Sequence, residues 1–276
     1  MQNFFDFTGK VVLVTGASSG IGRATAEFFG ECGATVAVSY LKNRAGADAA
    51  VAAISGSSIG RGMASGADSS TVSDVVETTG RALAVQADVT RVADIKAMVA
   101  HVEDEFGTID ILVNNAGSLV ERLKTLDLTE ERWDEVFNLN TKSAFFCAKE
   151  VIPGMLNKGA GVIINVTSIA GRNGGAPGSI HYSAAKGAMT TMTKGLAKEF
   201  AAQNIRVNGV SPGVIDTPFH ETFSTPEAMK NFANIIPMGR VGTSREVAQV
   251  IAFLASDAAA YLCGETIEIN GGMLMD

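Results

Sequence analysis

The segment that decides the fold is Val11-Val-Leu-Val-Thr-Gly-Ala-Ser-Ser-Gly-Ile-Gly22. Its first four residues form an uninterrupted apolar run, which is typical of a strand buried on both faces. Three glycines follow, at positions 16, 20 and 22, and a helical pattern begins at Ile21. Glycine has no Cβ atom, so these three positions leave the backbone N–H groups at the helix start open. Such N–H groups attract a pyrophosphate. The segment therefore predicts the first strand and turn of a dinucleotide-binding α/β unit.

Two other interpretations of this turn stay open. One is a tight strand-to-helix turn that binds no ligand. The other is a serine hydrolase, because Gly16 to Gly20 also matches the Gly-x-Ser-x-Gly nucleophile elbow with Ser18 in the middle. Such a hydrolase places its elbow several strands into the sheet and follows it with a late histidine, whereas the last histidine here is His220. The candidate cofactor contacts in the turn are Gly16, Ser18, Ser19, Gly20, Ile21 and Gly22.

Short apolar runs alternate with helical patterns along the rest of the chain. The predicted strands after the first are 35–40, 82–87, 109–114, 161–167, 205–211 and 265–270, and the predicted helices include 21–31, 91–106, 130–156, 179–202 and 244–256. Seven strands separated by helices indicate a single-domain, doubly wound Rossmann fold with a seven-stranded parallel sheet. The segment 55–71 departs from this rhythm, since four Gly and six Ser lie within it, and it predicts a flexible surface insertion.

Composition excludes several classes of function. The 276 residues are 46% hydrophobic and 18% charged, as expected for one globular domain. A formal charge of -7 argues against nucleic acid as a partner. No apolar run reaches the roughly 18 residues of a membrane span, and the start resembles no secretory leader, so we expect a cytoplasmic protein without a membrane partner. Three scattered cysteines and three scattered histidines predict neither a disulfide framework nor a metal site.

A proton-transfer pair is indicated by Tyr182 and Lys186, which lie four residues apart in a predicted helix and so share one face. An ammonium group beside a phenol stabilises the phenolate and brings its pKa toward the working range. Ser168 follows the fifth predicted strand, 14 residues before Tyr182, and a glycine-rich loop between them can bring the two hydroxyls together. Taken alone, a serine in this position is more often a cap or a solvated turn.

Further candidate contacts follow the third and fourth predicted strands. Asp88 and Val89 come just after strand three, where a carboxylate could accept a hydrogen bond from an adenine amino group, although an exposed loop Asp would look the same. Asn114, Ala116 and Gly117 end strand four, where small residues let a cofactor pass and an amide can tie neighbouring strands together. An ordinary Asn-Gly turn is the alternative there.

Together these motifs resemble those of the short-chain dehydrogenase/reductase family, in the family's order and over about residues 9–272. The resemblance implies that Tyr182 is the general acid/base, that Lys186 lowers its pKa and holds the nicotinamide ribose, and that Ser168 binds the reacting oxygen. It also implies that Asn140 anchors a water molecule in a proton relay; Asn138 is close by, but the spacing from Trp133 favours Asn140.

The same resemblance assigns the loop after strand six to the nicotinamide carboxamide, through Pro212, Gly213, Ile215 and Thr217. The following segment, 218–238, is expected to form a substrate lid, although its apolar residues could equally be ordinary packing. Relatives include oxoacyl reductases and sugar or steroid dehydrogenases and are usually tetramers. We therefore expect a homotetramer that pairs the helices beginning at 130 and 179 and the C-terminal segment.

The choice between NADP and NAD depends on the end of strand two. An acid there would bind the ribose 2'-hydroxyl of NAD, but Tyr40 occupies that position. Lys42 and Arg44 follow, and their charges suit a 2'-phosphate, although both could simply project into solvent.

The sequence thus predicts an NADP(H)-dependent oxidoreductase that interconverts a ketone and a secondary alcohol of small-molecule size. The alternatives are an NAD-dependent enzyme with the same chemistry, a serine hydrolase acting through Ser18, and a non-catalytic nucleotide sensor.

Overall fold

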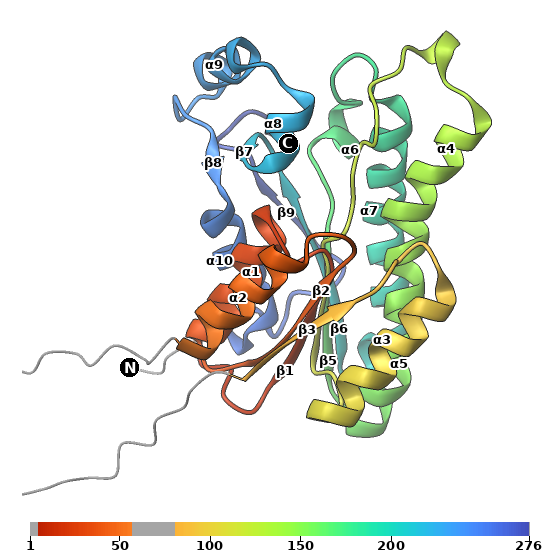
Figure 1. The fold of residues 1–276 in the computed structure, drawn as a ribbon, viewed down its shortest axis with the longest axis vertical. Coiled ribbons are helices and arrows are strands. Elements are labelled where there is room, and N and C mark those ends of the chain that lie inside the picture. Colours follow the sequence, from red (N-terminus) through yellow and green to blue (C-terminus); the bar gives the residue numbers. More distant parts are fainter. Residues whose placement is uncertain (1–4, 57–80, 276) are drawn as a thin grey trace, which may run out of the picture.

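The computed structural model describes residues 5–56 and 81–275. Its centre is a seven-stranded parallel sheet in the order β3-β2-β1-β4-β5-β6-β9, which confirms the predicted fold class (Figure 1). The strands are β1 (Val11–Val14), β2 (Thr35–Tyr40), β3 (Ala82–Gln86), β4 (Ile111–Asn114), β5 (Gly161–Val166), β6 (Ile205–Pro212) and β9 (Thr266–Ile269). Strand β1 pairs with both β2 and β4, so the strand order reverses beside it. Ligands of doubly wound sheets bind at such a reversal, outside the carboxyl ends of the strands.

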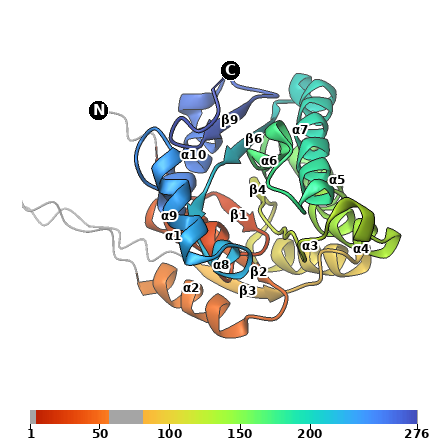
Figure 2. The same cartoon turned by 90° about the horizontal axis from the view of Figure 1, so that it is seen from above.

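Helices cover both faces of the sheet (Figures 1 and 2). Strand β1 alternates between two cores, because Val12 and Val14 belong to the cluster formed with α1 and α10, while Leu13 belongs to the cluster formed with α3 and α5. This burial on both faces explains the uninterrupted apolar run in the sequence. The helices in these layers are α1 (Gly20–Glu31), α2 (Arg44–Gly56), α3 (Val92–Phe106), α4 (Glu130–Phe137), α5 (Ser143–Lys158), α7 (Ile180–Phe200) and α10 (Ser244–Ala255).

The single helix predicted over 130–156 is wrong in one respect. A π-helical turn, Asn138–Lys142, separates α4 from α5. The amide Nδ2 of Asn140, in this turn, donates to the carbonyl of Val136 in α4 at 2.8 Å. Such wide turns often occur at functional sites, and an apolar periodicity cannot reveal them because the helix continues on both sides.

The segment 218–238, for which the sequence predicts a substrate lid, consists mainly of two short helices, α8 (Pro218–Phe223) and α9 (Pro226–Ile235). They lie above the carboxyl edge of the sheet (Figure 1), and the segment is called the predicted lid, or lid, below. Two short strands flank them, β7 (Ile215–Asp216) and β8 (Gly242–Thr243), and pair in parallel. The remaining helical segments are α6 (Ala170–Asn173) and the short turns Thr125–Asp127, Ala201–Gln203 and Asp257–Ala259. Of the predicted insertion 55–71, only residues 55 and 56 belong to the described chain, as the end of α2; the rest lies outside it.

Candidate active site

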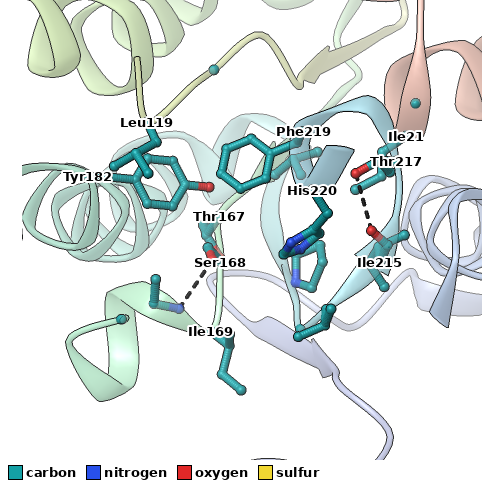
Figure 3. Close-up of a pocket in the computed structure, with 18 of the residues that line it drawn as sticks. Ile21, Leu119, Thr167, Ser168, Ile169, Tyr182, Ile215, Thr217, Phe219 and His220 are labelled. Carbon is teal, nitrogen blue, oxygen red and sulfur yellow. Dashed lines mark hydrogen bonds between the residues drawn. The ribbon is translucent and has the colours of Figure 1, made fainter. Parts of the chain in front are cut away.

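A cavity of about 500 Å³ opens at the carboxyl edge of the sheet, under the lid (Figure 3). Its walls come from the glycine-rich turn after β1, the end of β5, helix α7, the loop after β6, and α8. Ser168, Tyr182 and Phe219 lie on these walls, and the Tyr182 ring centroid is 5.8 Å from that of Phe219. The topology therefore gathers segments that are more than 150 residues apart in the chain, since Gly20 and His220 line the same cavity.

The glycine-rich turn packs closely against the end of β4. Gly16 has a φ of +63°, and a Cβ on it would lie 2.9 Å from the Ala116 Cα. A Cβ on Gly22 would collide with the Asn115 amide, which itself donates to the Thr15 carbonyl at 2.9 Å. At the start of α1, Ser19 makes no side-chain cap and the first turn contains no acidic residue. The first N–H groups of α1 are therefore available to an anion.

Lys186 is buried beneath Tyr182. Its Nζ atom lies 5.7 Å from the Tyr182 ring centroid and donates to the Val166 carbonyl at 2.8 Å. Ser168, at the end of β5, accepts a hydrogen bond from the Ala170 N–H at 3.1 Å. Tyr182 and Ser168 both face the cavity, as Figure 3 shows, so the structure brings together the two hydroxyls that the sequence placed 14 residues apart.

The protonation of Tyr182 and Lys186 differs from what the sequence predicts. Burial raises the pKa of Tyr182 to about 12, and the hydrogen bond with Ser168 opposes that rise. Burial also lowers the pKa of Lys186 to about 7. The predicted lowering of the Tyr182 pKa by Lys186 is therefore not seen in the protein alone, because both groups lose solvation and the ammonium bonds to the Val166 carbonyl.

Asn140 is fully buried next to this pair. Its Nδ2 atom donates to the Ser118 and Val136 carbonyls, both at 2.8 Å, and its Oδ1 atom has no hydrogen-bond partner among the described residues. A Cβ on Gly117 would lie 2.5 Å from that Oδ1 and 3.1 Å from the Lys186 Nζ. Gly117 thus leaves room beside an unpaired acceptor and a cation, and a buried polar space of this kind suits a water molecule.

The remaining candidates fall into two groups. The cavity is lined by Gly16, Ser19, Gly20, Ile21, Gly22, Ala116, Gly117, Pro212, Gly213, Ile215 and Thr217. Ser18, Tyr40, Lys42, Arg44, Asp88, Val89 and Asn114 do not line it. Within the first group, the Thr217 hydroxyl donates to the Ile215 carbonyl at 3.1 Å (Figure 3).

Asn114 has a structural partner rather than a place on the cavity wall. Its Nδ2 atom donates to Asn165 Oδ1 at 3.0 Å and to the Ala144 carbonyl at 3.2 Å. Asn165 in turn donates to the Thr193 hydroxyl at 2.9 Å, so buried amides join β4, β5 and α7. This is the strand-tying role that the sequence left open for an amide at this position.

The loop after β2 is bound to the glycine-rich turn. Asn43 Nδ2 donates to the Ser18 carbonyl at 3.2 Å, and its Oδ1 accepts from the Gly46 N–H at 3.0 Å. Arg44 Nε donates to both carboxylate oxygens of Asp48, at 2.9 and 3.0 Å, while Lys42 is exposed. After β3, Asp88 accepts hydrogen bonds from the backbone and hydroxyl of Thr90.

Leu119 and Arg122 are among the cavity residues that the sequence analysis did not predict. They lie in the irregular loop between β4 and α4, where no periodicity or motif distinguishes one side chain from another. Only the tertiary placement of this loop against the lid brings them to the cavity.

The geometry does not support a hydrolytic triad at Ser18. The ring nitrogens of His181 and His220 contact the Glu121 carbonyl and the Ser224 hydroxyl, and His101 is exposed on α3. No histidine of the described chain is therefore bonded to Ser18, as a nucleophilic serine would require. Residues 5–56 and 81–275 also contain no cluster of three metal-binding side chains and no helix with the length and apolar character to cross a membrane.

Two models of known protein families match the chain. The family model described as Enoyl-(Acyl carrier protein) reductase matches residues 49–274, and the short chain dehydrogenase model matches residues 10–78. The chain belongs to the short-chain dehydrogenase/reductase family. It is thus an oxidoreductase of that family, as the sequence motifs predicted.

Relatives match this short-chain dehydrogenase/reductase over nearly their full length. The 3-oxoacyl-[acyl-carrier-protein] reductase FabG of Vibrio harveyi is 39% identical over 97% of this chain and 98% of its own. The protein of the same name from Thermotoga maritima is 40% identical over 97% and 98%. The crystal structure of the Brucella melitensis protein titled Short-chain dehydrogenase/reductase SDR:Glucose/ribitol dehydrogenase has a TM-score of 0.83 and 33% identity, covering 99% of this chain and 100% of that chain.

The lowered pKa of Lys186 predicts a pH-dependent stability. Between about pH 7 and its ordinary pKa of 10.5, the unfolded chain binds a proton at Lys186 that the folded protein does not. The free energy of unfolding should therefore rise with pH in this window, by up to about 1.4 kcal/mol per pH unit from this group. The raised pKa of Tyr182 acts in the opposite sense, but only above its ordinary value of 10.0.

Urea unfolding of the wild type and of Lys186→Met across this window measures the effect. The wild type should gain stability relative to the variant as the pH rises, because the variant has no proton to lose. Parallel pH profiles for the two proteins would show that Lys186 keeps its proton in the folded state.

Proposed function

We propose that this short-chain dehydrogenase/reductase is an NADP(H)-dependent enzyme that interconverts a small-molecule ketone and a secondary alcohol, with Tyr182 as the general acid/base. The observation that carries the proposal is the pair of hydroxyls, Tyr182 and Ser168, on the wall of one cavity with the Lys186 ammonium behind them. Two donors directed at one point stabilise negative charge that develops on a carbonyl oxygen. The names of the FabG relatives, which are 3-oxoacyl reductases, support the same chemistry.

The residues of the site fit a nicotinamide dinucleotide. The glycine-rich turn and the uncapped start of α1 form a cradle for a pyrophosphate, and added Cβ atoms at Gly16 or Gly22 would disrupt it. Pro212, Gly213, Ile215 and Thr217 line the cavity on the lid side and would hold the nicotinamide end. When bound, the cofactor supplies or accepts the hydride; the protein orients it and handles the proton.

In the reductive direction the protein's own groups manage charge on the substrate oxygen. Tyr182 is a neutral phenol at neutral pH, because its pKa is raised to about 12, and this is the form that donates a proton. As the carbonyl oxygen becomes an alkoxide, the Tyr182 hydroxyl gives it a proton and the Ser168 hydroxyl donates a hydrogen bond. Lys186 stabilises the phenolate that remains, and a water held at Asn140 Oδ1 would lead toward the Lys186 ammonium.

Positive charge after β2 supports NADP over NAD. Tyr40 stands where an acid would repel a 2'-phosphate, and Lys42 and Arg44 follow it. Arg44 forms an ion pair with Asp48, whereas Lys42 is exposed. The neighbouring Asn43 donates a hydrogen bond to the Ser18 carbonyl. These side chains lie beyond the cavity, at the edge formed by β2 and β3, where the adenosine end would extend.

We also propose that the protein is a homotetramer. Exposed aromatic side chains on the helices expected at the interface support it, namely Trp133 on α4 and Phe145 on α5. Large exposed apolar side chains commonly mark a protein contact surface.

Removing the Tyr182 hydroxyl should abolish most of the activity. With a ketone panel and NADPH, followed at the absorbance band of the reduced nicotinamide, we expect Tyr182→Phe to lower kcat/KM about a thousandfold, as for loss of a general acid. Cofactor affinity, measured by protein fluorescence quenching, should change little. Tyr261→Phe, on a fully exposed tyrosine, is the matched control and should resemble the wild type. Full activity in Tyr182→Phe would refute the assignment.

Neutralising the two cations after β2 should lower the preference for NADPH. The double variant Lys42→Ala/Arg44→Ala should lose about a hundredfold in kcat/KM for NADPH while its kcat/KM for NADH changes by less than about threefold, because only NADPH carries the 2'-phosphate. Arg91→Ala removes another exposed, acid-paired arginine and should leave both values unchanged. Equal losses of kcat/KM with both cofactors would contradict the NADP assignment but not the hydride chemistry.

A further inference from the structure

The loop after β4 contains a strained turn at the cavity. Val120 has a φ of +64°, and the Glu121 N–H donates to the Leu119 carbonyl at 2.8 Å, which forms a γ-turn with a left-handed central residue. This form is rare and strained, and a β-branched residue makes it more costly. Strain of this kind persists only where surrounding contacts determine the backbone, and such positions cluster at functional sites.

Contacts from three elements hold this turn in place. Asn140 donates to the Ser118 carbonyl at 2.8 Å, His181 contacts the Glu121 carbonyl at 3.1 Å, and Arg132 pairs with the Glu121 carboxylate at 3.0 Å. His181 is buried and directly precedes Tyr182. The turn is therefore fixed to the elements that carry the proposed catalytic groups. It brings Leu119 (Figure 3) and Arg122 to the cavity wall.

Arg122 lies where the lid meets the body of the protein. Its Nε donates to the Phe223 carbonyl at the end of α8 at 3.0 Å, and one terminal nitrogen donates to the Pro177 carbonyl at 3.4 Å. These partners are neutral, and no carboxylate of the described chain pairs with Arg122, which lines the cavity. A guanidinium has five N–H donors in a planar fork, so donors remain for a ligand.

The charge of the cavity wall also favours a ligand bound by Arg122. No Asp or Glu of the described chain lines the cavity, although the whole protein carries a formal charge of -7. Besides Tyr182, the ionisable side chains on the wall are Arg122 and His220. Burial and the charge of Arg122 lower the pKa of His220, against the opposing effect of Asp216, so His220 is neutral at neutral pH. Arg122 is thus the persistent cation of the described wall.

We propose that Arg122 binds a carboxylate on the substrate, which is then a keto acid or hydroxy acid with an apolar body against Leu119 and Phe219. The inference rests on the proposed ketone and alcohol chemistry and names the class of substrate for it. A carboxylate matches the planar fork of one arginine, and the strained turn holds Arg122 at the cavity wall. Leu119 is buried beside Tyr182, and Phe219 contacts the Tyr182 ring, so the apolar body would lie next to the reacting oxygen.

Two probes that carry the same ketone test the proposal: 4-acetylbenzoate, which is charged, and its methyl ester, which is not. Binding to the full chain is measured by isothermal titration calorimetry with the cofactor present, and turnover is measured in parallel. We expect the wild type to favour the acid over the ester. Arg122→Gln should weaken binding and kcat/KM for the acid about tenfold, a modest value because Arg122 is partly solvated, and should change both by less than about threefold for the ester.

Two further variants separate recognition from support of the lid. Arg122→Lys keeps the charge and should recover part of the preference for the acid. Lys124→Gln removes an exposed charge two residues away that does not line the cavity, and it should behave as wild type. Equal losses for acid and ester in Arg122→Gln, or a wild type without preference for the acid, would overturn the proposal. Binding without turnover of either probe would instead contradict the proposed ketone chemistry while the affinities still decide the role of Arg122.

Discussion

The site depends on one buried hydrogen bond, from the Lys186 ammonium to the Val166 carbonyl at 2.8 Å. It fixes α7 against the end of β5, and Tyr182, one helical turn earlier, consequently faces the cavity next to Ser168. Glycines permit this approach, because a Cβ on Gly171 would lie 2.7 Å from the Gly187 backbone nitrogen. Helix α6, which follows Ser168, and helix α7, which carries Tyr182, can therefore pack backbone to backbone.

Burial disfavours the charged forms of the proposed acid/base pair, Tyr182 and Lys186. Removing the phenol and the ammonium from water raises the pKa of Tyr182 and lowers that of Lys186, so each group is disfavoured in its charged form. A proton can then leave Tyr182 most easily when negative charge appears on a substrate oxygen close to it. The unpaired Asn140 Oδ1 and the Lys186 Nζ both lie next to Gly117, where the proposed relay would supply a replacing proton.

Much of the fold could be predicted because its signals are local. The apolar run at Val11–Val14 reflects burial on both faces, and the glycines at 16 and 22 reflect close packing against Ala116 and Asn115. The π-helical turn at Asn138–Lys142 could not be predicted from the apolar pattern, since helix continues on both sides of it. Arg122 and Leu119 could not be found because their role arises from the placement of an irregular loop against the lid. The sign of the Tyr182 pKa shift was also missed, because spacing along a helix gives proximity but not solvation.

The central claim is that hydride moves between a nicotinamide and a substrate carbon held in this cavity. Its most direct test is reduction of a ketone with NADPH that carries deuterium at C4 of the nicotinamide, on one face and then on the other, in ordinary water. Mass spectrometry and NMR of the product should find one deuterium, bonded to the carbinol carbon, with one of the two cofactors. An alcohol that contains no deuterium with either labelled cofactor would contradict the account.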